Sequence, residues 1–261
     1  MEKLHNDSQD LLVSVLMPAY NAEKYVEIAI RSVMEQTISS WEMVIIDDHS
    51  TDETARVIEA CAQQDSRIRF YENEKNMGAA WTRNRGLDLC RGRYVALLDS
   101  DDVWLPEKLE KQLALAQREN ADIVYCSYGI INEHGEKRCN DFIVPEKTDF
   151  NTSLVKSVIS CSTALLSRTV TDHYRFPQGY YHEDLAMWLQ LLSDGMKAVG
   201  VQDVLAEYRV RSDSRAANKL SVARKRWYIY RDYLHLPLTK RVWAFVRYAF
   251  LGLRKYMDVY E

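Results

Sequence analysis

The sequence holds few of the residues that mark disordered, fibrous or disulfide-linked proteins. With only 9 glycines and 5 prolines in 261 residues, it is neither a low-complexity nor a collagen-like chain. Its five cysteines are odd in number and contain no Cys-x-x-Cys pair, which argues against a disulfide framework or a zinc site and fits a reducing cytosol. No run reaches the roughly 18 uninterrupted apolar residues of a membrane-spanning helix. These absences leave an ordinary globular protein.

The start of the chain and its charge distribution bear on location and partners. Residues 1–10 are polar and lack the basic start and apolar run of a secretory signal, so we expect the protein on the cytoplasmic side of the membrane. The net charge is −4, but residues 205–255 hold 13 basic and 3 acidic residues. Residues 1–204 hold 21 basic and 33 acidic ones. An acidic front and a basic tail predict two different partners.

Strand and helix signals alternate through the first hundred residues. Short apolar runs typical of strands buried on both faces are each followed by an amphipathic segment. The predicted strands are residues 11–17, 43–46, 68–71 and 94–98, and the predicted helices are residues 22–37, 52–64 and 79–90. Ser50 and Glu53 predict a capping box for the second helix. The alternation predicts an α/β fold with a parallel sheet between helices.

The remainder has longer helices and a polar insertion. It predicts a helix from residue 107 to about 120, strands at 123–127, 162–166 and 204–210, an irregular loop or hairpin at 132–152, and a helix to Ser193 that Gly195 closes. We therefore expect a main domain of residues 1–219, with halves at about 11–105 and 106–219. A helical tail of residues 220–261 follows.

Polar residues stand at the carboxyl ends of three predicted strands. They are Pro18 to Asn21, Asp47 with Asp48, and Asp99 to Asp102. In open α/β sheets, ligands bind beyond the carboxyl ends of the strands, so these segments should surround one cleft.

The acidic run at residues 99–102 suggests a metal site. Three carboxylates this close repel one another unless a cation lies among them, and hard oxygen ligands select Mg²⁺ or Mn²⁺. Asp99 and Asp101 are the candidate ligands, and substrate phosphates would share the ion. A solvated loop that caps the next helix is the alternative.

Other residues near the strand ends have chemistry suited to a nucleotide and a sugar. Tyr20 could stack on a base and Asp48 could accept from a ring N–H, although packing and helix capping explain either one alone. Asn76, Gly78 and Arg83 lie at a loop-to-helix junction that could bind phosphate. Glu183 and Asp184 precede an apolar helix, where a carboxylate could act as a general base or simply interact favourably with the helix dipole.

Five segments in order, VSVLMPAYN, VIIDDHSTDET, NMGAAWTRNRGL, YVALLDSDD and HED before LAMWLQLLSDG, resemble the bacterial family 2 inverting glycosyltransferases with the GT-A fold. The resemblance covers about residues 12–218. It implies a Rossmann-like, mixed but mostly parallel sheet, a nucleotide diphosphate sugar donor, most often a UDP-sugar, and Mn²⁺ or Mg²⁺ as cofactor. It also implies a glycan or lipid-linked acceptor in O-antigen, lipopolysaccharide or capsule synthesis.

The resemblance also implies roles for individual residues. Contacts to the nucleotide sugar fall to Pro18, Tyr20, Asn21, Asp48, Asn76, Gly78, Arg83, Asp99 and Asp102. Asp101 would hold the metal through the diphosphate, with Asp99 nearby, and Asp184, rather than Glu183, would be the base. Many relatives place a histidine ligand after the last strand, where this chain has Arg209 and Arg211; the third metal ligand is therefore left open, and an arginine could bind phosphate instead.

Two segments outside these motifs carry further expectations. Residues 211–219 are polar and basic and are interpreted as a lid over the diphosphate, or as a connector. Residues 240–255 form an amphipathic helix with a basic arc beside an aromatic and aliphatic one. This pattern favours binding to an anionic membrane surface, with packing onto the main domain or a dimer partner as the alternative.

Other functions fit the sequence less well. A sugar nucleotidyltransferase needs a glycine-rich phosphate loop and an NAD enzyme needs Gly-x-Gly-x-x-Gly, but residues 11–21 contain no glycine. A non-catalytic nucleotide-sugar sensor would not require Asp184 or the full acidic run. Nucleic-acid binding is disfavoured because no recognised module accompanies the basic tail.

Overall fold

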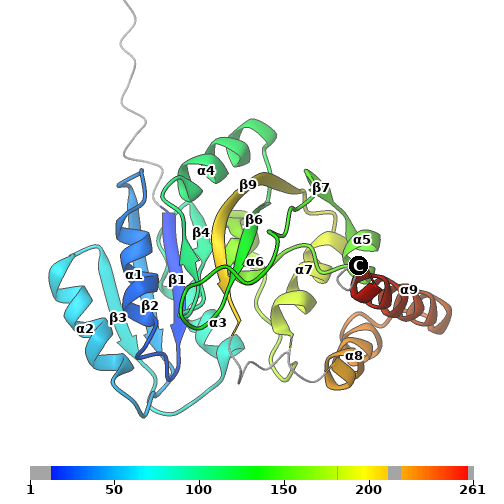
Figure 1. Cartoon of the computed structure of the whole chain (residues 1–261), viewed down its shortest axis with the longest axis horizontal. Coiled ribbons are helices and arrows are strands. Elements are labelled where there is room, and N and C mark those ends of the chain that lie inside the picture. The colour runs from blue at the N-terminus through cyan, green and yellow to red at the C-terminus, as the bar shows by residue number, and fades with distance from the viewer. Residues whose placement is uncertain (1–12, 181, 211–218, 258–261) are drawn as a thin grey trace, which may run out of the picture.

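The computed structural model describes residues 13–180, 182–210 and 219–257 of the chain. Within these residues a nine-stranded sheet runs in the order β3-β2-β1-β4-β8-β6-β9-β5, and β7 pairs with β9 (Figure 1). The predicted α/β class, with a mixed sheet, flanking helices and a C-terminal helix, is confirmed.

The first half is a parallel α/β unit. Its strands are β1 (Val13–Ala19), β2 (Trp41–Asp47), β3 (Ile68–Glu72) and β4 (Tyr94–Leu97), and its helices are α1 (Val26–Met34), α2 (Thr54–Gln64) and α3 (Ala79–Leu89). β1 lies between β2 and β4, parallel to both, so the carboxyl ends of these three strands share one edge. Every residue of β2 is buried, as expected of a parallel strand covered on both faces.

The two faces of this sheet pack against different helices. Val13, Val15 and Met17 of β1 belong to a core shared with α1 and α2. Leu16, between them, belongs to a second core shared with α3 and with α7 (Glu183–Ser193) of the second half. Successive side chains of a strand point to opposite faces, so the alternation along β1 separates the two layers.

The second half adds antiparallel strands. Its strands are β5 (Val103–Trp104), β6 (Ile123–Ile131), β7 (Lys147–Thr148), β8 (Leu165–Ser167) and β9 (Ala198–Arg209), and its helices are α4 (Lys108–Glu119), α5 (Phe150–Val155), α6 (Arg168–His173) and α7 (Glu183–Ser193). β8 joins the halves because it is antiparallel to both β4 and β6. The segment expected to be an irregular loop or hairpin, residues 132–152, starts with antiparallel bridges from Ile131 to Lys137 and from Tyr128 to Phe142, and it includes β7 and the start of α5.

Two local predictions have different outcomes. Gly195 follows α7 with a φ of +85°, and its N–H donates to the Leu192 carbonyl, so the predicted glycine closure is confirmed. The capping box at α2 is wrong. The Ser50 hydroxyl instead donates to Asp47, and the Asp52 carboxylate accepts the Thr54 N–H at 3.0 Å.

Helix α3 approaches β1 closely at Gly86. A Cβ at this position would lie 2.1 Å from Cδ1 of Leu16, far inside a van der Waals contact. The missing side chain allows α3 to lie close to the sheet. This contact sets the position of Arg83 one turn earlier on the helix.

Helix α4 contains a buried lysine, Lys108, which its highly charged sequence does not distinguish from an exposed one. Nζ of Lys108 bonds to Oε1 of Gln112 at 2.7 Å and lies 3.8 Å from the centroid of the Trp104 ring. Burial lowers the pKa of Lys108 to about 8. The ring face and the amide replace water around the ammonium group.

The C-terminal segment packs against the second half. It consists of α8 (Lys219–Tyr228), a π-helical turn (Ile229–Tyr233) and α9 (Leu238–Met257). Tyr230 and Ala244 are fully buried in a small core that includes Leu154 of α5 and Leu189 of α7. No helix in the described ranges is both long and apolar enough to cross a bilayer.

Candidate active site

A large cleft of about 570 Å³ lies at the carboxyl ends of β1, β2 and β4. Twelve residues that the sequence nominated line it together: Pro18, Tyr20, Asn21, Asp48, Asn76, Gly78, Arg83, Asp99, Asp101, Glu183, Asp184 and Arg209. Of the remaining two, Asp102 does not line the cleft, and Arg211 lies outside the described residues with most of the expected lid.

The rim of the cleft combines an exposed aromatic ring with a rigid backbone. The Tyr20 side chain is 43% exposed, an orientation suited to stacking on a planar ligand. Asn21 has a φ of +48°, and its side-chain oxygen accepts the Thr51 N–H at 2.9 Å. Its own N–H donates to the Ser50 hydroxyl. These bonds join the segments that follow β1 and β2.

Asp48 holds the loop that precedes α3. Its carboxylate accepts the N–H groups of Met77 and Gly78, both at 2.8 Å, and the side-chain amide of Asn73 at 2.7 Å. Two carboxylate oxygens offer about four acceptor positions, which leaves room for one donor from a ligand. Asn73 was missed in the sequence, because a single asparagine after a strand carries no signal.

The start of α3 suits an anion. Gly78 immediately precedes the helix with a φ of +86°, a conformation that side chains rarely adopt. Ala79 lines the cleft, and the first turn of the helix contains no acidic residue. The positive end of the helix dipole and the Arg83 guanidinium therefore face the same space as the three strand ends.

Arg83 joins the two halves of the molecule. The side chain is buried, and its Nη2 lies 2.6 Å from Oδ1 of Asp99 while its Nη1 lies 2.5 Å from Oε1 of Glu183. One guanidinium therefore bonds to a carboxylate that follows β4 and to another at the start of α7. This bond ties up Glu183, the less favoured candidate for the base.

Asp184, by contrast, points to open space. It is half-buried and lines both the large cleft and a second cavity beside it. Burial raises its pKa to about 6, and the neighbouring Glu183 carboxylate adds to the effect. A carboxylate titrating just below neutral pH is well matched to accepting a proton.

Asp102 has a different place from the one expected. It is 1% exposed, its Oδ1 accepts the Arg209 N–H at 2.8 Å, and its Oδ2 accepts the Ser162 hydroxyl. Burial, with Asp101 and Asp99 nearby, raises its pKa well above the usual range. Asp102 thus does not line the cleft in which a contact with the donor sugar was expected, and it ties the loop after β4 to β9.

Arg209 is held at the same end of the cleft. Its Nε donates to the Asp101 carbonyl at 2.8 Å, its Nη1 donates to the Asn132 carbonyl at 3.0 Å, and its guanidinium stacks on Tyr25. Arg209 is the last residue of β9, close to the position at which the family resemblance implies a histidine ligand in many relatives. It presents positive charge to the cleft instead.

The carboxylates fit a divalent ion that a bound diphosphate helps to hold. Asp99 and Asp101 line the cleft, and Arg83 bonds to one oxygen of Asp99. Within the described ranges no group of three His, Cys, Asp or Glu side chains is arranged around a metal position. Mg²⁺ sites commonly use one or two carboxylates with substrate phosphates and water, and this arrangement matches that pattern.

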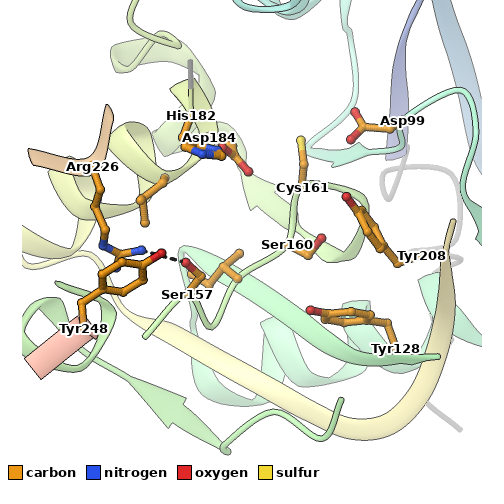
Figure 2. A pocket seen from close by; sticks show the side chains of 12 residues that line it. Asp99, Tyr128, Ser157, Ser160, Cys161, His182, Asp184, Tyr208, Arg226 and Tyr248 are labelled. Carbon is orange, nitrogen blue, oxygen red and sulfur yellow. Dashed lines mark hydrogen bonds between the residues drawn. The ribbon is translucent and has the colours of Figure 1, made fainter. Parts of the chain in front are cut away.

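The second cavity, of about 340 Å³, extends from Asp184 toward the C-terminal helices (Figure 2). We call it the side cavity. Its wall comprises Asp99, Tyr128, Ser157, Ile159, Ser160, Cys161, His182, Asp184, Leu185, Tyr208, Arg226 and Tyr248. The sequence did not indicate Tyr208 of β9, Arg226 of α8 or Tyr248 of α9 as site residues, since only the folded chain brings these three elements to one wall.

Comparison with known proteins identifies relatives along nearly the whole chain. The model of the family described as "Glycosyl transferase family 2" matches residues 14–175. TuaG of Bacillus subtilis (strain 168), provisionally assigned to teichuronic acid biosynthesis, is 38% identical over 94% of this chain and 97% of its own. The Escherichia coli UDP-Glc:alpha-D-GlcNAc-diphosphoundecaprenol beta-1,3-glucosyltransferase WfgD is 35% identical over 97% of this chain and 98% of its own.

Solved structures share the fold. Staphylococcus aureus TarS 1–349 in complex with UDP-GlcNAc superposes with a TM-score of 0.70 at 19% identity, covering 92% of this chain and 72% of that one. The mannosyltransferase PcManGT from Pyrobaculum calidifontis, in complex with GDP-Man and Mn²⁺, has a TM-score of 0.70 at 20% identity, with coverage of 91% and 72%.

Proposed function

This chain belongs to glycosyl transferase family 2, and on that premise we propose that it transfers a hexose from a UDP-sugar to a hydroxyl of a polyprenyl-diphosphate-linked glycan with inversion. The product would enter a cell-surface polysaccharide. The observation that carries the proposal is the position of Asp184 at the junction of two cavities. The name of WfgD, with its UDP-glucose donor and lipid-linked acceptor, supports the choice of substrates.

The large cleft is the proposed donor site. Tyr20 stacks on the base, and Asp48 accepts one of its N–H donors with the acceptor position that its protein partners leave open. The start of α3 and Arg209 face the diphosphate. Because Asp48 also fixes the loop before α3, recognition of the base and placement of the phosphate-binding groups depend on the same carboxylate.

Asp184 is the proposed general base. It takes the proton of the acceptor hydroxyl as that oxygen bonds to the anomeric carbon, while the bond from that carbon to the diphosphate oxygen breaks. Attack opposite to the leaving group inverts the anomeric centre, so an α-linked donor gives a β-linked product. Glu183 acts through Arg83, by neutralising it and holding it against Asp99.

Asp101 and Asp99 would hold a divalent ion together with the diphosphate. Such an ion would supply positive charge to the departing nucleoside diphosphate. The protein residues alone provide few ligands, so the proposal includes metal binding that depends on the nucleotide.

The test is a transfer assay with the full chain, Mn²⁺, a panel of UDP-sugars and an α-GlcNAc-diphosphate-alkyl acceptor. We expect one donor to give a β-linked disaccharide, identified by mass spectrometry and by the anomeric coupling in NMR. EDTA or Asp101→Ala should lower turnover at least about 100-fold, because the leaving group loses its counter-charge.

The controls separate catalysis from binding. Mn²⁺ alone should hardly change the melting temperature, whereas Mn²⁺ with UDP should raise it more than UDP alone does. Asp101→Ala should abolish that difference. Binding of UDP without transfer from any donor would identify a nucleotide-sugar-binding protein and overturn the proposal.

Helix α9 supports a second part of the proposal, peripheral binding to an anionic membrane. Its inner face packs on the protein through Ala244, while five apolar side chains on its outer side are 46–61% exposed: Leu238, Val242, Trp243, Val246 and Phe250. The exposed Arg247 lies among them. An apolar face with basic residues suits the boundary between headgroups and acyl chains.

Membrane binding is tested by sedimentation with vesicles that contain anionic lipid. Val246→Glu with Phe250→Glu should reduce the bound fraction, with a partition coefficient at least about tenfold lower, because each apolar side chain contributes roughly 1.5–3 kcal/mol when buried. Ile28→Glu, at an exposed apolar position on α1, is the matched control and should bind as the wild type does. Equal binding by the Val246/Phe250 variant would exclude α9 as the docking surface.

A further inference from the structure

Arg226 is a buried cation without an acidic partner among the described residues. It is 3% exposed, and its Nε donates to the Tyr230 hydroxyl at 2.6 Å. Its Nη2 donates to the carbonyls of Ser153 and Leu154, and its Nη1 to the Ser157 hydroxyl at 3.1 Å. All of these acceptors are neutral. A buried charge that only neutral groups surround is costly unless an anion joins it.

The surroundings of Arg226 hold its guanidinium rigidly at the side cavity. The guanidinium stacks on the Tyr248 ring, 4.4 Å from its centroid, and both residues line the cavity wall. Figure 2 shows the two side chains together with Ser157 on one side of the cavity, away from Asp99 and Tyr208. The Ser157 oxygen accepts from Arg226, so its own proton is available to a ligand.

The electric field of this cation reaches the catalytic end. Burial lowers the pKa of His182; the Glu183 carboxylate opposes this shift, and the charges of Arg226 and Lys225 add to it. The cavity has a positive wall at Arg226 and a carboxylate at Asp184. A ligand that fills it should carry a hydroxyl at one end and negative charge at the other.

We propose that Arg226, with Ser157 and Tyr248, binds the phosphate attached to the reducing end of the acceptor sugar. This inference rests on the proposed function. The sugar ring lies in the side cavity between the two ends, presents its hydroxyl to Asp184 and places its anomeric phosphate at the guanidinium. The C-terminal helices α8 and α9 thus complete the acceptor site and make it selective for a sugar phosphate or diphosphate over a neutral glycoside.

The experiment compares two acceptors that differ only in charge, α-GlcNAc-diphosphate-alkyl and the neutral α-GlcNAc-alkyl, with wild type and Arg226→Gln. For the diphosphate acceptor, Arg226→Gln should raise KM about 10- to 100-fold, the usual effect of losing a hydrogen bond between charged groups. KM for the neutral acceptor and for the UDP-sugar should not change. Arg226→Lys should recover part of the loss, since it keeps the charge.

A matched control and a milder variant guard against a folding defect. Arg224 lies on the same helix, and its Nε donates to the Tyr228 hydroxyl just as Nε of Arg226 does to Tyr230, but it is exposed and outside the cavity. Arg224→Gln should leave both acceptors unaffected. If Arg226→Gln does not fold, Ser157→Ala removes only a hydroxyl and should still raise KM for the diphosphate acceptor severalfold.

Several outcomes overturn the inference while the proposed function stands. Wild-type transfer to both acceptors with equal KM would exclude a phosphate subsite. An equal loss for both acceptors in Arg226→Gln would show a structural role. A loss of binding to anionic vesicles with unchanged KM for the soluble diphosphate acceptor would assign the cation to a lipid headgroup. If the wild type transfers to neither acceptor with any donor, the proposed function fails instead.

Discussion

Asp184→Asn should reduce kcat about 10²- to 10⁴-fold, the usual contribution of a general base, while UDP binding is unchanged. The same variant should be more stable than the wild type at pH 7. The folded state raises the pKa of Asp184 from 3.8 to about 6, so the native protein holds its proton more tightly than the unfolded chain does. The stabilisation that comes from this tighter proton binding is fully present below pH 4 and is lost as the pH rises through 6. At pH 7 the free energy of unfolding is therefore lower by about 2–3 kcal/mol.

Turnover and unfolding should therefore move in opposite directions for this variant. Denaturant titration at pH 7 measures how much the free energy of unfolding of Asp184→Asn exceeds that of the wild type. The same titration at pH 4 should show almost no difference between the two proteins. In the wild type, kcat/KM should fall as the pH drops below about 6, when the carboxylate is protonated. If Glu183→Gln abolishes turnover while Asp184→Asn retains it, the base has been assigned to the wrong carboxylate.

Arg83→Gln should be the most destabilising single change at the site. It removes the guanidinium that bonds to both Asp99 and Glu183 and leaves two carboxylates close together, one of them buried. Breaking a buried ion pair in this way costs about 3–5 kcal/mol, measurable by urea titration at pH 7. Transfer should fall as well, because α7 and the loop after β4 lose their common anchor.

A double variant separates charge from position. Arg83→Gln with Glu183→Gln removes one of the uncompensated carboxylates, so it should recover part of the stability that Arg83→Gln loses. It should not recover transfer, since no guanidinium then holds Asp99. An Arg83→Gln protein as stable as the wild type would mean that Asp99 and Glu183 do not depend on this cation.

The fold of the first half could be predicted because local signals agree with the tertiary structure there. Parallel strands covered on both faces need continuous apolar runs, and β1 and β2 have them. Since their carboxyl ends must meet, the residues just beyond them could be assigned to one cleft without coordinates. The predicted ends of helices were less accurate: α1 begins at Val26 rather than at residue 22, because the residues before it form a turn.

The second half was harder to predict because its signals depend on partners. β9 begins at Ala198, whereas the sequence predicted a strand only from residue 204. The polar Gln202 and Asp203 interrupt its apolar pattern at the point where the pairing register with β6 shifts. The two-residue strands β5 and β7 exist only because β9 offers them hydrogen bonds. Such pairings leave no period in the sequence.

Single charged residues show the same limit. The acidic run at residues 99–102 predicts a metal site, but the sequence does not show which carboxylates face it. In the fold, Asp102 is buried in the protein and Asp101 lines the cleft. The basic tail looked like one amphipathic helix, yet α9 divides its aromatic residues, with Phe245 packed edge-on against Trp227 and Trp243 exposed. Arg226 is one of many cations in the tail, and only the folded structure shows that it is buried at the side cavity.

Helix α9 has a consequence for how such an enzyme must be measured. One side of it supplies Tyr248 to the side cavity, and the other carries the exposed apolar residues. A protein that rests on a bilayer through that outer face meets its acceptor in two dimensions, so its rate follows the mole fraction of acceptor in the surface rather than the bulk concentration. Detergent added to dissolve a long-chain acceptor would then act as a diluent, and apparent constants would drift with the amount of micelle.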